Sequence, residues 1–244
     1  MKIPNMQNQK LKFGRGNAKL DKTIYTFSLP AGHSCPFAFE CEAKADKKTG
    51  KLTDGKNQTF RCFAASQEAL YPTVRNARWH NYEILKGLRT SDQMVNVIQS
   101  SLPKKASIVR VHVSGDFFNQ KYFDAWMQVA KSNPDRKFYA YTKSIPYWLT
   151  RKDSIPKNFS LTSSMGGRND ELIELNDLKY AKVFMSTEEA KKQKMELDHD
   201  DSHAYDGKKS FGLLLHGNQK KGSKASVALR ELKKKGIKGY SKNK

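Results

Sequence analysis

The sequence predicts an α/β fold in which six βα units form a partial or distorted TIM-type barrel. Two observations lead to this prediction. Short β-rich runs alternate with helical patterns from residue 23 onward, and polar residues follow most of the predicted strands, at the ends where parallel folds carry their chemistry. Periodicity alone leaves an open doubly wound sheet as the alternative architecture.

Six segments have the length and the β-branched or aromatic content of buried strands. They are 23–29, 107–114, 137–142, 159–164, 181–186 and 210–216. Apolar residues at helical spacing predict helices between them. These helices cover 63–88, 91–101, 119–132, 170–178, 187–195 and 223–235. Residues 44–58 are charged, contain glycine and lack periodicity, so we expect a flexible insertion there.

Positive charge is concentrated at the two ends of the chain. The net charge is +21, and residues 1–22 and 219–244 supply +14 of it. We therefore expect a barrel-like domain over 23–218, a basic N-terminal extension over 1–22, and a basic C-terminal helix and tail over 219–244. Such ends attract polyanions, which predicts contact with nucleic acid. A merely solvated basic surface explains the same composition, and no known nucleic-acid-binding motif accompanies it.

We expect a cytoplasmic protein that does not insert into a membrane. No apolar run approaches the roughly 18 residues of a membrane span. The first residues lack the apolar core of a secretory signal. An odd number of cysteines, three in all, argues against a framework of disulfides and favours thiols or thiolate ligands.

The three cysteines fall between the first predicted strand and the first predicted helix. Five residues separate Cys35 from Cys41, and Cys62 follows after twenty more. Three thiolates from one loop can surround a single centre, and N–H groups at the start of the helix stabilise negative charge. We therefore predict that Cys35, Cys41 and Cys62 bind a [4Fe-4S] cluster in the loop after the first strand.

With only three thiolates, one iron of such a cluster is open to another ligand. Water, a small molecule or a histidine could fill this position, the candidate histidines being His33, His199 and His203. Zinc is an alternative metal, since His33 would complete a Cys3His site, although short Cys-x2-4-Cys spacing is missing. A third interpretation is three buried thiols without any metal.

Further candidate residues lie at the ends of other predicted strands. Asp116 ends the segment Ser114-Gly115-Asp116 and is a candidate catalytic carboxylate or a helix N-cap. Lys143 could bind a carboxylate or phosphate as a point charge, or lie on the surface. Ser163 and His216 end two more strands and are candidate cofactor-binding residues, with His216 expected at the same mouth as the cysteines.

Two other groups of polar residues are ambiguous. Residues 198–203 contain three carboxylates and two imidazoles, which suits proton transfer by His203 or a second metal site, but also an exposed polar loop. Arg110 and His112 are expected to point to the same side of their strand, where His112 is more simply a hydrogen-bonded core histidine.

Several motifs resemble those of a phage-encoded family, the gene product 88 type. They are LPAGHSCPFAFEC, RCFAASQEA, RVHVSGDFF, FYAYTKS, LTSSMGG and DHDDSHA, and the resemblance covers nearly all of 23–240. It implies a bacteriophage protein that works in the cytoplasm of the host cell.

More distantly, the pattern is similar to radical S-adenosylmethionine enzymes. These have a (βα)6 partial barrel and three cluster cysteines after the first strand. Phe63 directly follows Cys62, where that family commonly has an aromatic residue, and Ser114, Gly115 and Asp116 lie where it binds the methionine amino group. The cysteine spacing and the single glycine depart from the family pattern. The resemblance thus implies an enzyme with S-adenosylmethionine as a second cofactor, acting on an unknown small molecule.

Overall fold

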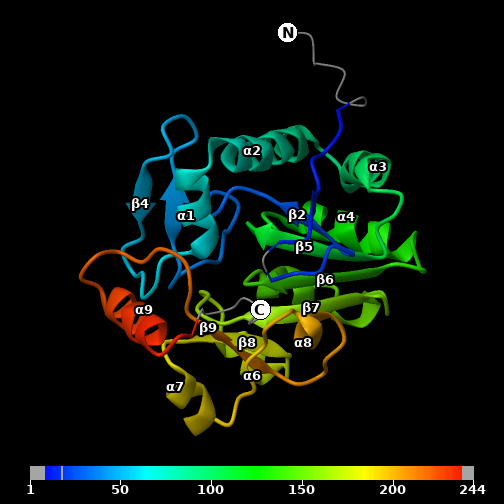
Figure 1. Ribbon diagram of the computed structural model, residues 1–244. Helices are drawn as coiled ribbons and strands as arrows, with labels where there is room; N and C mark the ends of the chain where they lie inside the picture. The colour runs from blue at the N-terminus through cyan, green and yellow to red at the C-terminus, as the bar shows by residue number, and fades with distance from the viewer. Residues whose placement is uncertain (1–8, 18, 238–244) are drawn as a thin grey trace.

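The computed structural model describes residues 9–17 and 19–237. A seven-stranded sheet in the order β1-β2-β5-β6-β7-β8-β9 forms its centre (Figure 1). β1 pairs antiparallel with β2, and the other neighbours are parallel. The strands are β1 (Gly14–Arg15), β2 (Ile24–Ser28), β5 (Ile108–Ser114), β6 (Lys137–Thr142), β7 (Phe159–Ser164), β8 (Tyr180–Phe184) and β9 (Phe211–Leu214).

All six predicted strands are confirmed, but they do not close into a barrel. The six parallel strands follow one another in chain order from β2 to β9. At one edge, β2 pairs with the short antiparallel β1 instead of with β9, so the sheet stays open. The fold is thus a mixed α/β fold with a mostly parallel sheet. Residues 1–8 and 238–244 of the predicted basic ends lie outside the described residues.

Helices α2 to α6 contribute to the main core on one face of the sheet. This core joins apolar side chains of these helices to Val109, Val111, Phe138, Phe159 and Leu161 of the strands. The helices are α1 (Phe63–Leu70), α2 (Pro72–Gly87), α3 (Ser91–Ser101), α4 (Gln120–Lys131), α5 (Ile145–Leu149), α6 (Glu171–Leu175), α7 (Thr187–Lys192), α8 (Ser202–Tyr205) and α9 (Lys224–Lys234), with a 3-10 turn at Lys152–Ser154.

The opposite face of the sheet, here called the inner face, carries a second, smaller core. Ile24, Tyr139, Ala181 and Phe211 of the strands pack there with Leu20 and, from α8, Ala204. This face also borders the cavity described below.

The predicted helix over 63–88 is in fact two helices. Tyr71 has extended backbone angles (φ −121°, ψ 96°) and separates α1 from α2. Pro72 is the reason, because its ring disfavours the helical conformation in the preceding residue and it donates no backbone hydrogen bond. The break makes α1 a separate short helix that begins directly after Cys62.

The predicted flexible insertion at 44–58 contains a β-hairpin instead. β3 (Ala43–Ala45) pairs with β4 (Leu52–Asp54) in antiparallel register. Asp46 stabilises the turn, because its carboxylate accepts hydrogen bonds from the backbone N–H groups of Lys48 and Thr49. Ala43 and Ala45 are buried on one face of β3. The charged residues around them explain why the sequence predicts a loop there.

His112 reverses the alternation of side chains in β5. Its φ is +72°, and the pairing of β2 with β5 shifts register beside it. As a result Arg110 borders the inner cavity, whereas His112 packs against Phe117 and Tyr122 in the main core. The expectation that Arg110 and His112 share one side is therefore wrong. A bulge shifts the alternation of side chains by one residue, so residues two positions apart no longer point to the same face.

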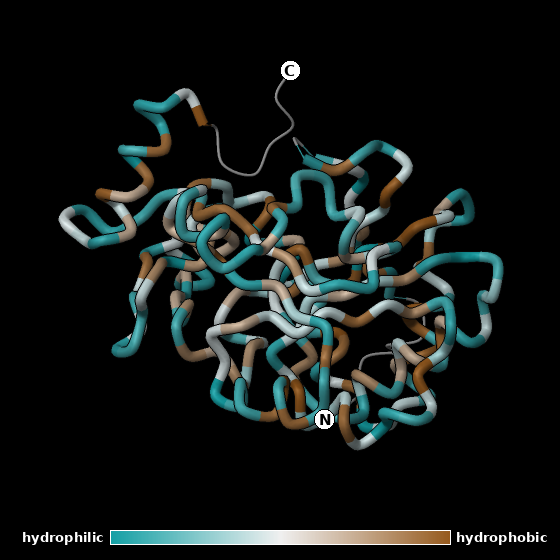
Figure 2. The backbone as a smooth tube through the Cα atoms, turned by 90° about the horizontal axis from the view of Figure 1, so that it is seen from below, coloured by the Kyte–Doolittle hydropathy of each residue, from teal (hydrophilic) through white to brown (hydrophobic). Residues whose placement is uncertain are grey.

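The tube in Figure 2 is mostly hydrophilic in its outer loops, and α9 lies at the periphery in both views (Figures 1 and 2). Among residues 9–17 and 19–237, none of the helices combines the length and the hydropathy needed to cross a bilayer.

Candidate functional site

A cavity of about 450 Å³ lies between the inner face of the sheet and the cysteine loop, residues 30–62. Strands β5 to β8 and the region of β9 supply one wall, while the end of the cysteine loop and the start of α1 supply the other. Its main lining residues are Asn17, Lys19, Cys41, Phe60, Arg61, Cys62, Phe63, Gln67, Arg110, Val113, Tyr141, Lys143, Ser164, Val183, Leu213, Leu215 and His216. Its size is within the range of small-molecule sites.

The cysteine loop is attached to the loop after β7. Ala38 forms an isolated antiparallel bridge with Gly167. The backbone N–H of Glu40 donates to the carbonyl of Gly166 at 3.0 Å. These bonds hold the segment between Cys35 and Cys41 against the carboxyl end of the sheet.

The same loop is attached to the segment that follows β9. The backbone N–H of Arg61 donates to Gln219 Oε1 at 2.7 Å, and Gln219 Nε2 donates back to the Arg61 carbonyl at 3.3 Å. Ser66 Oγ donates to the carbonyl of Asn218. Loops after the first and the last parallel strand thus meet and enclose the cavity that the open sheet leaves unclosed.

The three cysteine thiols lie close enough together to influence one another's ionisation. Burial raises the pKa of Cys35, and negative charge on Asp116, Cys62 and Cys41 raises it further. Burial raises the pKa of Cys41 to about 11, where the charge of Lys143 opposes and that of Cys62 reinforces the effect. All three cysteines are free thiols.

Cys62 lies at the amino end of α1. Burial raises its pKa, while hydrogen bonds from the backbone N–H groups of Ala65 and Ala64 act in the opposite direction. Those N–H groups are the unpaired donors of the first helical turn, which favour a thiolate. Within the described part of the chain, no group of three or more His, Cys, Asp or Glu side chains has its ligand atoms arranged around a common metal position.

Cys35 borders a second cavity of about 330 Å³ on the other side of the loop. His33, Glu42, Lys44 and Arg168 give it a polar lining. The cysteine loop therefore separates two cavities, with Cys41 and Cys62 facing one and Cys35 facing the other.

Asp116 links the carboxyl ends of β5 and β6 beside the thiols. Its carboxylate accepts hydrogen bonds from Thr142 Oγ1 (2.6 Å), Lys143 N (2.7 Å) and its neighbour Phe117 N (2.7 Å). Burial raises its pKa to about 6 despite these bonds. The residue thus combines the predicted position near the cysteines with a structural role between two strand ends.

Lys143 is buried, and neutral oxygens surround its ammonium group. Nζ donates to the carbonyl and the hydroxyl of Ser164 (2.7 and 2.9 Å) and to the carbonyl of Met165 (2.5 Å). Its charge therefore acts on the cavity and on Cys41 without neutralisation by a hydrogen-bonded carboxylate.

The other predicted cofactor-binding residues occupy different places. Ser114 donates to Glu68, and Gly115, at φ +82°, lets the cysteine loop approach β5, because an added Cβ would lie 2.5 Å from Ser34 Oγ. Ser163 Oγ is buried with no hydrogen-bond partner in the described chain. Ser114, Gly115 and Ser163 do not line the cavity.

His216 lines the cavity together with Cys41 and Cys62. Its Nδ1 lies 3.0 Å from the carbonyl of Leu214, so Nδ1 carries the proton, and burial lowers the pKa of the imidazole. The ring packs on Phe63 at 4.7 Å between centroids. His216 is therefore a neutral side chain in the wall of the cavity.

Residues 198–203 do not lie at the carboxyl ends of the strands. α8 contacts β6 and β7, and Lys179, just before β8, donates to the carbonyls of Ala204 and Gly207. The segment therefore covers the amino end of the inner face. The exposed-loop alternative is also wrong for Asp198 and Asp201, which are fully buried.

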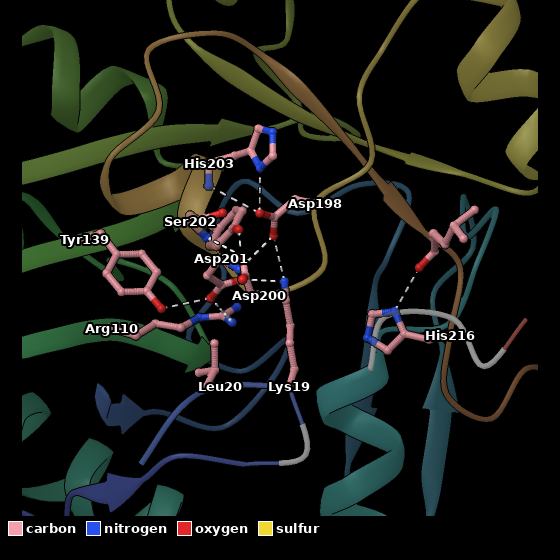
Figure 3. Close-up of polar contacts among 12 residues, drawn as sticks. Lys19, Leu20, Arg110, Tyr139, Asp198, Asp200, Asp201, Ser202, His203 and His216 are labelled. Atoms are coloured by element: carbon pink, nitrogen blue, oxygen red, sulfur yellow. Dashed lines mark hydrogen bonds and ion pairs between the residues drawn. The ribbon is translucent and has the colours of Figure 1, made fainter. Parts of the chain in front are cut away.

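Asp201 is the centre of a buried ionic network, called here the Asp201 cluster, at the floor of the cavity (Figure 3). Arg110 Nη1 (2.6 Å), Lys19 Nζ and the hydroxyls of Tyr139 and Tyr141 all donate to its carboxylate. Burial alone would raise the pKa of Asp201, yet Arg110 and Lys19 hold it below the ordinary value.

The predicted catalytic residue His203 belongs to the outer part of this cluster. Its Nδ1 lies 2.9 Å from Asp198, and its Nε2 lies 3.3 Å from Glu196. Burial would lower its pKa, but these two carboxylates raise it. His203 does not line the cavity, because its ring is held on the far side of Asp198 (Figure 3).

Neither His33 nor His199 lies at the cavity. His33 Nε2 lies 3.0 Å from the carbonyl of Ala45, its ring packs on Trp79, and it borders the second cavity. His199 is exposed. Neither lines the cavity that contains Cys41 and Cys62, which leaves His216 as the histidine of that wall.

Sequence reasoning missed Glu68, which supports the cysteine loop from α1. Its Oε1 accepts hydrogen bonds from Ala31 N (2.9 Å), Arg78 Nη1 (2.9 Å) and Ser114 Oγ (3.2 Å). Glu68 is fully buried beside the alanines of α1. A carboxylate in an otherwise small and apolar helix face was the signal available in the sequence.

Comparison with known proteins identifies the family. The model of the family described as Gene product 88 matches residues 4–235. The Gene 88 protein of Mycobacterium phage L5 is 31% identical over 128 residues, which cover 48% of this chain and 47% of that protein. The match thus spans about half of the relative's length, and no solved structure matches the chain. Neither match is to a radical S-adenosylmethionine enzyme. The chain belongs to the Gene product 88 family of phage proteins.

Proposed function

We propose that this protein holds a [4Fe-4S] cluster through Cys35, Cys41 and Cys62 and binds a small molecule in the adjoining cavity. The observation that carries the proposal is the group of three partly buried free thiols. Cys41 and Cys62 line the cavity of about 450 Å³, and the charges of both raise the pKa of Cys35. Ionising all three thiols to thiolates would cost electrostatic free energy unless a cation binds among them.

The surroundings of the thiols suit iron and sulfide. Metal binding replaces the thiol protons, which removes the mutual repulsion of three thiolates. The N–H groups of Ala64 and Ala65 and the ammonium group of Lys143 would stabilise the remaining negative charge. The chemistry of three thiolates therefore suits a metal centre, and Cys35, Cys41 and Cys62 are the residues that would hold it once their side chains turn towards a common position.

When bound, such a cluster would supply an iron without a thiolate ligand, capable of Lewis-acid or radical-type chemistry. The chain's own residues would act around it. The positive charge of Lys143 would stabilise negative charge near Cys41. The packed rings of Phe63 and His216 would exclude water from one wall of the cavity.

S-adenosylmethionine is the ligand that the distant resemblance suggests. Both oxygens of Asp116 already accept hydrogen bonds from the protein, so this carboxylate would have to rearrange to bind an amino group. Adding S-adenosylmethionine to reduced protein and recording the electron paramagnetic resonance spectrum tests this part separately. An unchanged spectrum would remove S-adenosylmethionine from the proposal.

Anaerobic purification or reconstitution, followed by iron and sulfide assays, tests the cluster. We expect about four iron and four sulfide per chain, as the [4Fe-4S] stoichiometry requires. Cys35→Ala, Cys41→Ala and Cys62→Ala should each lose most of the iron. Thr59→Ala is the control, because it changes the same loop without removing a thiol. Full iron in two of the three cysteine variants would contradict the shared site. Stoichiometric zinc in a colourless protein would favour the Cys3His alternative.

An alternative function is non-catalytic binding of nucleic acid or of a host factor, with the metal site as a structural element. The exposed basic residues of the C-terminal region favour nucleic acid as the partner. Lys221, Lys224, Arg230, Lys233 and Lys234 are all exposed on or next to α9. Basic residues on one peripheral helix can follow a phosphate backbone. Binding of a fluorescent DNA duplex that weakens steeply with salt, and that is lost on charge neutralisation of α9, would support it. The iron assays would decide separately whether the metal site exists.

A further inference from the structure

The cavity presents hydrogen-bond donors and positive charge to whatever it binds. Four basic side chains line it, and no Asp or Glu among the described residues does. The basic residues are Lys19, Arg61, Arg110 and Lys143. The carboxylates that pair with three of them, Asp54, Asp198 and Asp201, lie behind the lining.

Arg61 is the best-placed of these cations, since it adjoins Cys62. Its Nε and Nη2 donate to the two oxygens of Asp54 at 2.8 and 2.7 Å, which fixes the plane of the guanidinium. Gln219 holds its backbone on both sides. This bidentate clamp leaves Nη1 as the remaining donor group of a guanidinium whose residue lines the cavity.

Two side-chain amides add further donors. Gln67 accepts a hydrogen bond from Arg78 through Oε1, and Asn17 accepts from the backbone of Lys19 and Leu20 through Oδ1. Because the oxygens are used inside the protein, the NH2 groups are what Gln67 and Asn17 can offer to a ligand. A ligand rich in acceptors matches this lining.

The remaining lining is flat and apolar. Phe60 and the Phe63–His216 ring pair supply aromatic surfaces, and Val183 and Leu213 of the sheet supply an aliphatic wall. Aromatic rings of this kind stack on planar heterocycles.

We infer that the cavity binds a nucleoside monophosphate or a closely similar nucleotide, with its phosphate at Arg61 and its base between the aromatic and aliphatic walls. A phosphate satisfies the cation and the amide donors, and a nucleobase adds both acceptors and a flat apolar body. Any catalytic role of the nucleotide rests on the proposed function, because the nucleotide would lie beside Cys41 and Cys62. Binding itself does not require the iron.

Calorimetric titration of the full chain with AMP, adenosine and inorganic phosphate tests the inference. AMP should bind at least about tenfold more tightly than either fragment, because only AMP engages both the cation and the rings. Equal affinity for adenosine and AMP would overturn the phosphate assignment. Equal affinity for phosphate and AMP would overturn the base assignment, and the absence of any AMP binding would overturn the whole inference.

Arg61→Gln should weaken AMP binding by about 10- to 100-fold while leaving adenosine unchanged, as expected for a charge-assisted hydrogen bond. Arg168→Gln is the matched control, because Arg168 also pairs with a carboxylate of the cysteine loop, Glu42, but does not line this cavity. Equal losses in the two variants would indicate a general charge effect and contradict the assignment.

Phe60→Leu gives a second test that leaves the Arg61 clamp in place. It should weaken AMP and adenosine together and leave phosphate unchanged, and unchanged AMP affinity would contradict the stacking role. Iron and sulfide assays on the same samples separate the two proposals. AMP binding by a chain that never takes up iron would refute the cluster alone, whereas an iron-containing chain that ignores AMP would refute the nucleotide alone.

Discussion

The floor of the cavity and its cysteine wall are both polar, but only in the floor do carboxylates and cations neutralise one another. In the Asp201 cluster, Lys19 and Arg110 meet the carboxylates of Asp198 and Asp201, and the tyrosine hydroxyls complete the network. At the cysteine wall, burial and mutual repulsion raise the pKa values of the thiols, with Lys143 as the nearby cation. The difference indicates that the floor serves structure, whereas the wall is the place where we propose that a metal centre binds.

The largest effect should come from breaking the floor. Asp201→Asn should lower the free energy of unfolding by about 3–5 kcal/mol, because it leaves Lys19 and Arg110 buried without their shared carboxylate. Urea unfolding measures this. Asp206→Asn is the control, since its pair with Lys137 is about half exposed and should cost at most about 1 kcal/mol. A comparably small cost for Asp201→Asn would remove the structural role of the floor.

The raised pKa of Cys41 in the cysteine wall should make the folded protein less stable in alkaline solution. In the metal-free, reduced protein the pKa of Cys41 is raised from 9.0 to about 11, so the folded state keeps a proton that the unfolded state loses. Stability is therefore complete below about pH 9 and falls as the pH rises towards 11, by roughly 2–3 kcal/mol. Urea unfolding at several alkaline pH values should show this loss in the wild type and a flatter profile in Cys41→Ala. Identical profiles would contradict the raised pKa of this thiol.

Weakening the support of the cysteine loop should have an intermediate effect. Glu68→Gln keeps the shape of the side chain but removes the charge that pairs with Arg78, at a cost of about 1.5–3 kcal/mol in unfolding free energy. The loop that begins at Ala31 should loosen, so that a thiol reagent modifies Cys35 faster. Glu83→Gln, which loses an exposed pair with Lys47, should change neither quantity.

The smallest effect should come from removing one donor from the floor. Tyr139→Phe deletes the hydrogen bond from the phenol to Asp201 (2.9 Å), and Arg110, Lys19 and Tyr141 still satisfy that carboxylate. We expect a loss of about 1 kcal/mol in unfolding free energy. A loss as large as that of Asp201→Asn would show that the cluster acts as one indivisible unit.

At acid pH, the stability of the protein should depend on the floor, through the carboxylate of Asp201. Because the pKa of Asp201 is lowered in the folded state, its contribution to stability is present above about pH 4 and is lost as the pH falls through the lowered value. Asp201→Asn should therefore flatten the acid limb of a stability profile and leave the alkaline limb unchanged. An unchanged acid limb would contradict the lowered pKa.

The strands were predictable because each is a short run of β-forming residues with a clear boundary. Six runs were located to within a few residues, including 137–142 and 159–164 without error. The sheet order also follows from right-handed crossovers between successive parallel strands. The open edge of the sheet could not be predicted, because the pairing of Gly14–Arg15 with β2 involves only two residues and leaves no periodic pattern in the sequence.

The site was harder to predict than the fold because side-chain direction depends on single backbone angles. The positive φ of His112 sends this residue to the helix side, although its spacing from Arg110 predicts the same side. The 198–203 segment was placed at the wrong end of the strands, because sequence shows which residues follow a strand but not where a long loop returns. Glu68 and Lys19, in contrast, were single charged residues whose partners lie far away in the chain.

The contact between Arg61 and Gln219 joins residues 158 positions apart. A contact of such long range has an entropic cost of loop closure that the structure of the intervening chain must offset. The compartment beside Cys62 therefore depends on the segment that follows β9. A shortened chain that stops before residue 216 would keep all three sulfur atoms but would lose His216 from the cavity wall and the Gln219 contact that holds Arg61.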